Sequence, residues 1–349
     1  MPLAADASRK HDMIEEKNME LNSIFRDGMV LAADKPIRVF GKGEGRVTVR
    51  FLGETVTALS SGSDWCAELS PRNVGGPYEM QIDMGGVNVE IKDIYVGVVL
   101  LLHGQSNMAF QLRQSAFPKE AYRYCGRVRL YSPKKVLEGI EALEEKWVPC
   151  NETYAGQFSA IGYHVGMQLA EELGCAVGMI SCHQGASVIQ AWMDEDAEAR
   201  LGIHLLPEDR YRDWVKFAAW NRAGCLYRQL VQQVMPYSLS HILWYQGESN
   251  ASVAEANVYG LLLKDLIRLR RVDFADPCLP FIVIQLANNQ NRAGEAWSKI
   301  QASQLEIANE MQDVYSVICA DVCEDDDIHP PTKAPLAERI ANVILRLNG

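Results

Sequence analysis

The stretch from Val98 to Met108 reads VVLLLHGQSNM and decides the fold. A run of branched apolar residues predicts a buried strand that is too short to span a membrane. The polar residues that follow predict a sharp strand-to-helix turn. Ser106 would then present its hydroxyl outward near a helix N-terminus, where backbone N–H groups can face a developing negative charge. The stretch is typical of a nucleophilic serine, although taken alone it is better explained as a simple helix N-cap.

Composition bounds the class of protein. The chain has 349 residues, of which 48% are hydrophobic and 23% are charged, which is ordinary for a globular protein of about two domains. Its formal net charge is −11. An acidic chain without a basic cluster argues against nucleic acid or an anionic membrane as the partner, while a small anionic substrate stays compatible with local arginines.

Cysteine usage and the N-terminus bear on compartment and metal content. The nine cysteines are scattered and include no CxxC pair. This pattern favours free thiols in a reducing compartment. No Cys/His cluster has the spacing of zinc ligands, so we expect no metal and no cofactor. The N-terminus lacks the apolar segment of a signal peptide, so we expect a cytoplasmic protein, with a secreted mature form left open.

The pattern of polar and apolar residues changes twice along the chain. Residues 1–24 predict a polar arm. Residues 25–93 alternate polar and apolar positions between glycine-rich turns, which predicts a small β-sandwich domain. Residues 94–349 alternate strands and helices, which predicts an α/β domain with a parallel sheet covered on both faces. Its expected strands are 94–103, 127–131, 176–182, 241–246, 280–287 and 315–320, and its expected helices are 159–173, 214–235, 255–271, 294–311 and 333–347.

Several polar residues follow these strands, where α/β sheets bind their ligands. His329 precedes two prolines in the loop before the last helix, and Asp326 lies three residues upstream. Asp326 could orient the His329 imidazole toward Ser106 in a catalytic triad. Backbone N–H groups of Ser106 and Gly185 and the side-chain amide of Gln246 could form an oxyanion hole. Taken singly, each is also explained as a surface loop or polar turn.

These residues resemble a known family. The segments GQSNM (104–108), GASVIQAW (185–192), WYQGESN (244–250) and DDIH (326–329) are similar to the successive blocks of SGNH-type hydrolases, and most closely to their sialate O-acetylesterase-like carbohydrate esterases. The resemblance implies a flavodoxin-like three-layer domain. It also implies Ser106 as nucleophile, His329 as base, Asp326 as its acid, and Gly185 and Gln246 in the oxyanion hole.

The sequence departs from the family pattern at three positions. Ala186 replaces the second glycine of its block, His103 stands where a small residue is usual, and Arg228 replaces an asparagine. Glu248 could support the His329 loop or the turn that carries Gln246.

The resemblance implies a serine esterase that removes O-acetyl groups from a carbohydrate, with O-acetylated sialic acid as the first candidate. Asn107, Trp192, Arg228 and Arg292 are candidate substrate-binding residues, with Arg113 and Trp297 as further ones. Acetylated xylan is the second candidate substrate. An esterase with an apolar acyl pocket, a non-catalytic carbohydrate-binding protein and a homo-oligomer stay open.

Overall fold

The computed structural model describes residues 19–60, 62, 64–135, 145–203, 215–292 and 294–348. Most of the expected N-terminal arm lies outside these ranges, as do His11 and His204.

A central sheet runs through the larger part of the molecule. Among the described residues its strand order is β10-β9-β11-β8-β12-β13-β14, and all neighbours are parallel except the antiparallel β10 at one edge. The strands are β8 (Val87–Gly104), β9 (Cys125–Tyr131), β10 (Trp147–Cys150), β11 (Ala176–His183), β12 (His241–Tyr245), β13 (Phe281–Ile284) and β14 (Val314–Val317). The branched residues Val99–Leu102 of β8 are fully buried, as their apolar run predicts.

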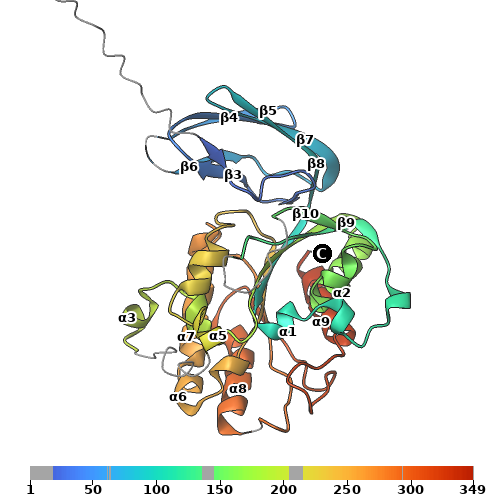
Figure 1. Cartoon of the computed structure of the whole chain (residues 1–349), viewed down its shortest axis with the longest axis vertical. Coiled ribbons are helices and arrows are strands. Elements are labelled where there is room, and N and C mark those ends of the chain that lie inside the picture. Colours follow the sequence, from blue (N-terminus) through green and yellow to red (C-terminus); the bar gives the residue numbers. More distant parts are fainter. Residues whose placement is uncertain are drawn as a thin grey trace, which may run out of the picture.

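Helices cover both faces of this sheet (Figure 1). The helices α2 (Ala160–Glu172) and α9 (Ala334–Asn348) lie on one face, and α6 (Val253–Ala256), α7 (Tyr259–Asp273) and α8 (Glu295–Glu310) lie on the other. Leu336, Ile340 and Ile344 of α9 are fully buried, in agreement with their predicted stripe. The expected mixed α/β architecture with a parallel sheet is therefore present.

Antiparallel strands form a separate layer beyond one end of the central sheet (Figure 1). Three of its strands form a sheet with the order β1-β3-β6. The strands β4, β5 and β7 belong to the same sheet as the central strands: β4 pairs with β5 and β7, and β7 pairs with β8. These strands are β1 (Glu20–Leu21), β3 (Ile37–Lys42), β4 (Gly45–Phe51), β5 (Glu54–Ser60), β6 (Asp64–Leu69) and β7 (Gly75–Met84). The predicted boundary after residue 93 falls inside β8, which runs unbroken from this layer into the central sheet. The short β2 (Val30–Ala32) joins β8 beside that point.

Two expected helices are interrupted. The stretch predicted as one helix over 214–235 contains the short α5 (Val215–Ala218) and a π-helical turn at Tyr227–Val231. Gly224 lies between them with a left-handed φ of 69°, a conformation that a continuous right-handed helix does not contain. The helix predicted over 255–271 is divided into α6 and α7, and the short α3 (Ala197–Leu201) and the edge strand β10 were not predicted. No helix in the described ranges is long and apolar enough to cross a bilayer.

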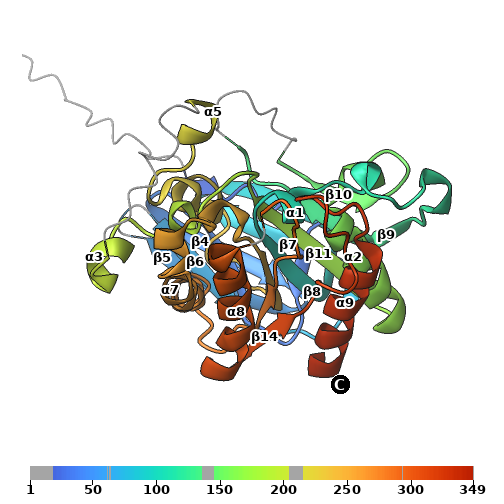
Figure 2. The ribbon, with the colours of Figure 1, turned by 90° about the horizontal axis from the view of Figure 1, so that it is seen from below.

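The carboxyl ends of β8, β11 and β12 lie at one edge of the sheet because these strands are parallel. Figure 2 looks at this edge and shows the short helix α1 (Ser106–Ala109) among the connecting loops. The residues expected to carry chemistry follow these strands, so the fold gathers them in one region.

Candidate active site

Ser106 stands on a tight turn between β8 and α1. Gly104 ends the strand with a φ of 130°, and a Cβ placed there would lie 2.1 Å from the carbonyl oxygen of Tyr245 in the neighbouring strand. Only glycine fits this close approach without a shift of backbone. Ser106 is half-buried and begins α1, so its N–H has no acceptor within the helix. The strand end thus presents both a hydroxyl and a free backbone donor.

His329 reaches Ser106 from the loop between β14 and α9. Its Nε2 atom lies 2.8 Å from Ser106 Oγ, and its ring stacks on Phe110 with centroids 6.2 Å apart. Burial lowers the pKa of His329, and the charges of Lys333 and Arg292 lower it further while Asp327 opposes them. The imidazole is therefore neutral near pH 7 and can accept the proton of the hydroxyl.

Asp326 does not approach the His329 ring. It is exposed, and its backbone carbonyl accepts a hydrogen bond from Asn291. The neighbouring Asp327 instead accepts the backbone N–H of His329 at 2.9 Å, a local turn that aspartate readily forms. The geometry thus contradicts the expected Asp326–imidazole contact. Asp327 is the carboxylate that acts on His329, through its charge and the backbone.

Asn107 was expected to bind substrate, but its side chain is buried and occupied. Its Nδ2 donates to Glu248 Oε1 at 2.6 Å and to the carbonyl of Ile328 at 2.9 Å. Its Oδ1 accepts from Lys333 Nζ at 2.6 Å. Both hydrogens of this amide are used, so it has no donor left for a ligand. Of the two roles considered for Glu248, these contacts favour support of the His329 loop.

Gln246 was expected to donate to an oxyanion, and the structure contradicts this. The residue is fully buried. Its Nε2 donates to Asn250 Oδ1 at 2.7 Å and to the carbonyl of Ser187 at 2.9 Å, and its Oε1 accepts from Tyr259. An amide nitrogen has only two hydrogens, and both are used. Gln246 therefore ties the turns after β11 and β12 together.

Gly185 does lie beside the nucleophile. A Cβ placed on it would be 3.7 Å from Ser106 Cβ, and its carbonyl accepts Trp220 Nε1 at 3.1 Å. Among the described residues no hydrogen bond uses its N–H as donor, so this group can face a developing oxyanion. Ala186 has a left-handed φ of 52°, the conformation that glycine adopts without strain. Asn221 holds the turn by donating to the carbonyl of Ala186 at 2.7 Å.

The aromatic candidates for sugar stacking belong to the core. Trp192 is fully buried and donates to Ser187 Oγ at 2.9 Å, and Trp297 is 4% exposed and donates to the carbonyl of Ala287. His103 packs edge-on against Trp192 and accepts from Arg270 at 3.3 Å. The unusual histidine is thus part of a buried polar cluster, and neither tryptophan offers a face to a sugar.

The three candidate arginines differ in their surroundings. Arg228 pairs with Glu195, and Arg113 donates to Gln111. Arg292 is exposed. Burial lowers the pKa of His329 and the Arg292 charge lowers it further, whereas burial raises the pKa of Glu248 and the Arg292 charge opposes that rise. Of the three, Arg292 is the one whose charge acts on the Ser106–His329 pair.

Sequence reasoning missed several residues that shape the site. Lys333 is 1% exposed and bonds Asn107, although a lysine in a polar loop is ordinarily exposed. Gln105 Oε1 accepts the backbone N–H of Ser249 at 3.3 Å. Asn250 lies within the WYQGESN segment, so that segment contained a usable signal, whereas Asn221 and Lys333 stand in stretches with no motif.

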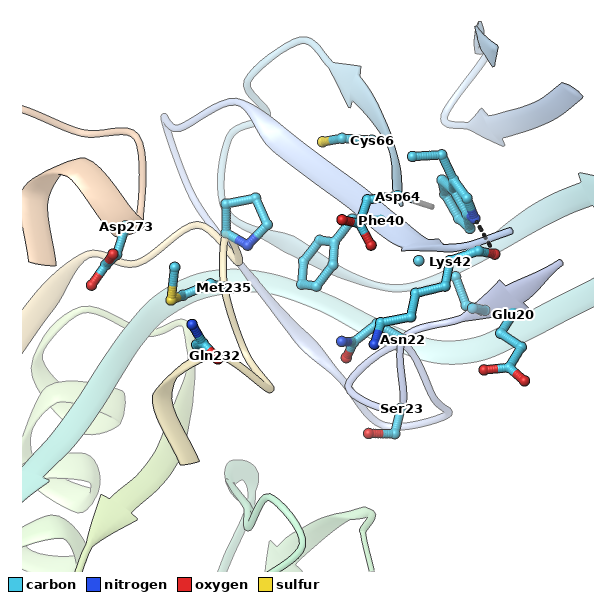
Figure 3. Close-up of a pocket in the computed structure, with 14 residues that line it drawn as sticks. Glu20, Asn22, Ser23, Phe40, Lys42, Asp64, Cys66, Gln232, Met235 and Asp273 are labelled. Atoms are coloured by element: carbon cyan, nitrogen blue, oxygen red, sulfur yellow. Dashed lines mark hydrogen bonds between the residues drawn. The ribbon is translucent and has the colours of Figure 1, made fainter. Parts of the chain in front are cut away.

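Other features lie apart from this pair. In the parts of the chain that the structure describes, no three His, Cys, Asp or Glu side chains come together as a metal site. A cavity of about 820 Å³ lies between the N-terminal strands and residues 232–236, lined in part by Phe40, Trp65 and Asp273 (Figure 3). Neither Ser106 nor His329 lines this cavity, so it is not part of the candidate active site.

A serine hydroxyl within hydrogen-bond distance of a neutral imidazole, at the carboxyl ends of the strands of a parallel sheet, is typical of serine hydrolases. The family model for the carbohydrate esterases described as sialic acid-specific acetylesterases matches residues 96–346. The chain belongs to this family.

Known relatives agree with that assignment. The sialate O-acetylesterase of Pongo abelii is 24% identical over 334 residues, covering 85% of this chain and 62% of the relative. The human sialate O-acetylesterase is 24% identical over 335 residues, covering 84% and 63%. The chain therefore spans less than two thirds of each relative. The crystal structure of a carbohydrate acetylesterase from Xanthomonas citri matches with a TM-score of 0.81 and 27% identity over 94% of this chain and 75% of that one.

Proposed function

We propose that the protein is a serine esterase that removes O-acetyl groups from a carbohydrate, with O-acetylated sialic acid as its substrate. The observation that carries this proposal is the 2.8 Å contact between His329 Nε2 and Ser106 Oγ. That distance lies within the range in which a general base can take the proton of a nucleophile. Family membership supplies the substrate class.

The first chemical step forms an acetyl-enzyme. Ser106 Oγ attacks the acetyl carbonyl carbon while its proton passes to His329 Nε2. The carbonyl oxygen becomes an oxyanion, which the N–H groups of Ser106 and Gly185 stabilise. His329 then returns the proton to the sugar oxygen as the bond between that oxygen and the acetyl carbon breaks, and the sugar leaves as an alcohol.

The second step releases acetate. Water gives a proton to His329 Nε2 and attacks the acetyl carbon on Ser106, and the same N–H groups stabilise the second oxyanion. Collapse of this intermediate returns the proton to Ser106 Oγ and frees acetic acid, which ionises to acetate in water. The enzyme is regenerated with a neutral imidazole, the state that its lowered pKa favours.

Arg292 favours an anionic sugar over acetylated xylan as substrate. Its guanidinium is exposed and acts electrostatically on His329, so it lies where it could pair with the carboxylate of a bound sialic acid. A neutral xylan backbone offers no such group.

The finer description of the fold is also part of this proposal. We assign residues 94–349 to a flavodoxin-like SGNH catalytic domain and residues 25–93 to a small β-sandwich domain. The arrangement of α2 and α9 opposite α7 and α8 around the parallel sheet supports the first assignment. The antiparallel pairing of the strands in the N-terminal layer supports the second.

Acetate release tests the reaction. Wild-type protein and the variant Ser106→Ala would be incubated with O-acetylated sialic acid, acetylated xylan oligosaccharides and aryl esters of increasing acyl length. We expect release from the sialic acid by the wild type and a loss on the order of 10⁴-fold or more in the variant. Equal turnover by both proteins would overturn the mechanism. Preference for xylan or for long acyl chains would overturn the substrate assignment.

Arg292→Ala tests the anionic substrate separately. We expect kcat/KM on O-acetylated sialic acid to fall roughly tenfold, because a charge-assisted hydrogen bond is lost, and activity on a neutral aryl acetate to change little. Arg268→Ala is the matched control, since Arg268 is also exposed but lies on α7. Equal effects of the two variants on the sialic acid would contradict a role for Arg292.

A further inference from the structure

One buried amide connects the two halves of the candidate active site. Asn107 directly follows Ser106, and its Nδ2 donates to the carbonyl of Ile328, which directly precedes His329. The side chain is 3% exposed. A single hydrogen bond of 2.9 Å thus joins the turn that carries the nucleophile to the loop that carries the base.

Two opposite charges hold this amide. Glu248 Oε1 accepts from Asn107 Nδ2 at 2.6 Å, and Lys333 Nζ donates to Asn107 Oδ1 at 2.6 Å. Glu248 is 2% exposed and Lys333 is 1% exposed. The ammonium also lies over the rings of Phe110 and Tyr245, at 5.2 and 5.7 Å from their centroids. We call Asn107, Glu248 and Lys333 the buried cluster.

Burying these charged side chains lowers the stability of the fold. Each buried ion loses several kcal/mol of hydration, and apolar residues of the same volume would stabilise the fold at least as well. Glu248 Oε2 is buried with no hydrogen-bond partner among the described residues. Packing alone therefore does not account for the arrangement, whereas its hydrogen bond between the chain neighbours of the two reactive residues does.

We propose that the buried cluster positions His329 against Ser106, the role that an orienting carboxylate fills in a Ser-His-Asp triad. Asp326 is not available for that role, because it is exposed and does not contact the imidazole. The members of the buried cluster are positioning residues, since none of them contacts the Ser106 hydroxyl or the imidazole. The expected effect on kcat rests on the proposed function, whereas the expected effect on the position and pKa of His329 does not.

The buried cluster also acts on the charge state of His329. After burial, Lys333 is the strongest influence that lowers the pKa of His329; Arg292 lowers it further, and Asp327 raises it. Around Lys333 itself, burial lowers the pKa of the ammonium, against the opposing charges of Cys323, Cys319, Glu248 and Glu324. Loss of the Lys333 charge should therefore let the pKa of His329 rise toward 6.5.

The test separates charge, hydrogen bonding and fold. Lys333→Gln keeps a donor for Asn107 without the charge, and Lys333→Met removes both. The double variant Lys333→Met/Glu248→Gln avoids leaving an uncompensated buried carboxylate, and it serves if the single variants do not fold. Lys264→Met is the matched control, because Lys264 pairs with Glu310 at the surface between α7 and α8. Asp326→Asn tests the rival assignment.

The first readout is the pKa of His329, measured by NMR on protein with labelled histidine and assigned with His329→Gln. We expect Lys333→Gln and the double variant to raise this pKa toward 6.5, with no change in Lys264→Met. This titration uses no substrate, so its result stands even if the wild type releases no acetate. A pKa of His329 that is unchanged in the folded Lys333 variants would overturn the proposed effect of the Lys333 charge on His329.

The second readout is kinetic. We expect Lys333→Met to lower kcat about tenfold to a hundredfold at a pH where His329 is neutral, with little change in KM, because a displaced base slows the reaction more than binding. Lys333→Gln should recover most of that loss, and Asp326→Asn should stay within about threefold of wild type. A large loss in Asp326→Asn, with wild-type kcat in Lys333→Met, would overturn the proposal.

Discussion

His329 Nε2 lies 2.8 Å from Ser106 Oγ, although 223 positions separate the two residues in the chain. Ser106 follows the central strand β8, and His329 follows the edge strand β14. The loop after β14 must therefore cross the ends of β13 and β12 to reach the nucleophile. The hydrogen bond from Asn107 to the carbonyl of Ile328 holds that loop beside Ser106. The Ser–His distance therefore depends on contacts between loops from both strand ends.

The pH profile should report the neutral state of His329. Burial and Lys333 lower the pKa of His329 below 6.5, so the imidazole is still neutral somewhat below pH 6.5. The kcat/KM on an uncharged acetate ester should therefore be retained in that range. Activity should fall only when the pH drops through the lowered pKa. Asp327→Asn removes the carboxylate that raises this pKa, while its amide oxygen can still accept the His329 N–H. The acid limb should therefore move to lower pH.

Asp325→Asn is the control for that measurement, because Asp325 is an exposed carboxylate of the same loop. A limb at or above pH 6.5 in the wild type, or an upward shift in Asp327→Asn, would contradict the electrostatic description of His329.

Gly104→Ala should damage both stability and activity. The added Cβ meets the Tyr245 carbonyl oxygen at 2.1 Å on a backbone with φ of 130°, so either β12 or the Ser106 turn must move. We expect the free energy of unfolding to fall by about 3 kcal/mol or more. Gly126→Ala at the start of β9 is the control, since nothing lies within 4 Å of its Cβ position. Equal urea midpoints for the two variants would show that the turn tolerates a side chain.

Gln246→Met should act mainly on stability. The variant leaves the Ser187 carbonyl without its buried donor, which costs about 1–3 kcal/mol. It also removes one of the two donors to Asn250 Oδ1, which keeps the N–H of Ile189. Thermal unfolding measures the loss, and Gln168→Met provides a control, because Gln168 makes an exposed hydrogen bond to Asn342. A stable protein with kcat reduced a hundredfold would instead indicate an oxyanion donor.

Stability should decline in mild acid because of buried histidines. Burial lowers the pKa of His241 to about 4, and it lowers the pKa of His103 well below 6.5. Both stay neutral in the folded protein while the unfolded chain takes up protons below pH 6.5. Each therefore removes about 1.4 kcal/mol per pH unit as the pH falls from about 6.5 toward 4. Urea unfolding at a series of pH values measures this slope.

His241→Leu should reduce the slope by about 1.4 kcal/mol per pH unit. Unfolding free energies that stay constant from about pH 6.5 to pH 5 would rule out neutral buried histidines as the cause of acid sensitivity.

The parallel sheet and the Ser106–His329 contact could be predicted from the sequence. Polar segments that follow parallel strands lie at one edge, so the strand assignments predicted the GQSNM and DDIH segments on the same edge of the sheet. Helices α2, α8 and α9 also match their predicted ranges within a residue or two. These features depend on local patterns, which a single sequence displays.

The hydrogen-bond partners of the buried amide side chains could not be predicted from the sequence. Asn107 and Gln246 stand in motif segments, and nothing local shows whether such an amide faces a ligand or another buried group. In the structure, partners from at least two other segments occupy each amide. Lys333 shows the same limit, since its burial depends on Asn107 and Glu248 from distant strand ends. Asp326 was chosen by its spacing from His329, which the local turn at Asp327 overrode.

The most direct test of the central claim is to look for the acetyl group on Ser106. Wild-type protein would be quenched in acid during turnover of O-acetylated sialic acid, digested and analysed by peptide mass spectrometry. We expect the peptide that contains Ser106 to gain the mass of one acetyl group in the wild type and to remain unmodified in Ser106→Ala. Sustained acetate release by Ser106→Ala at the wild-type rate, or acetylation at a different residue that follows turnover, would contradict the account.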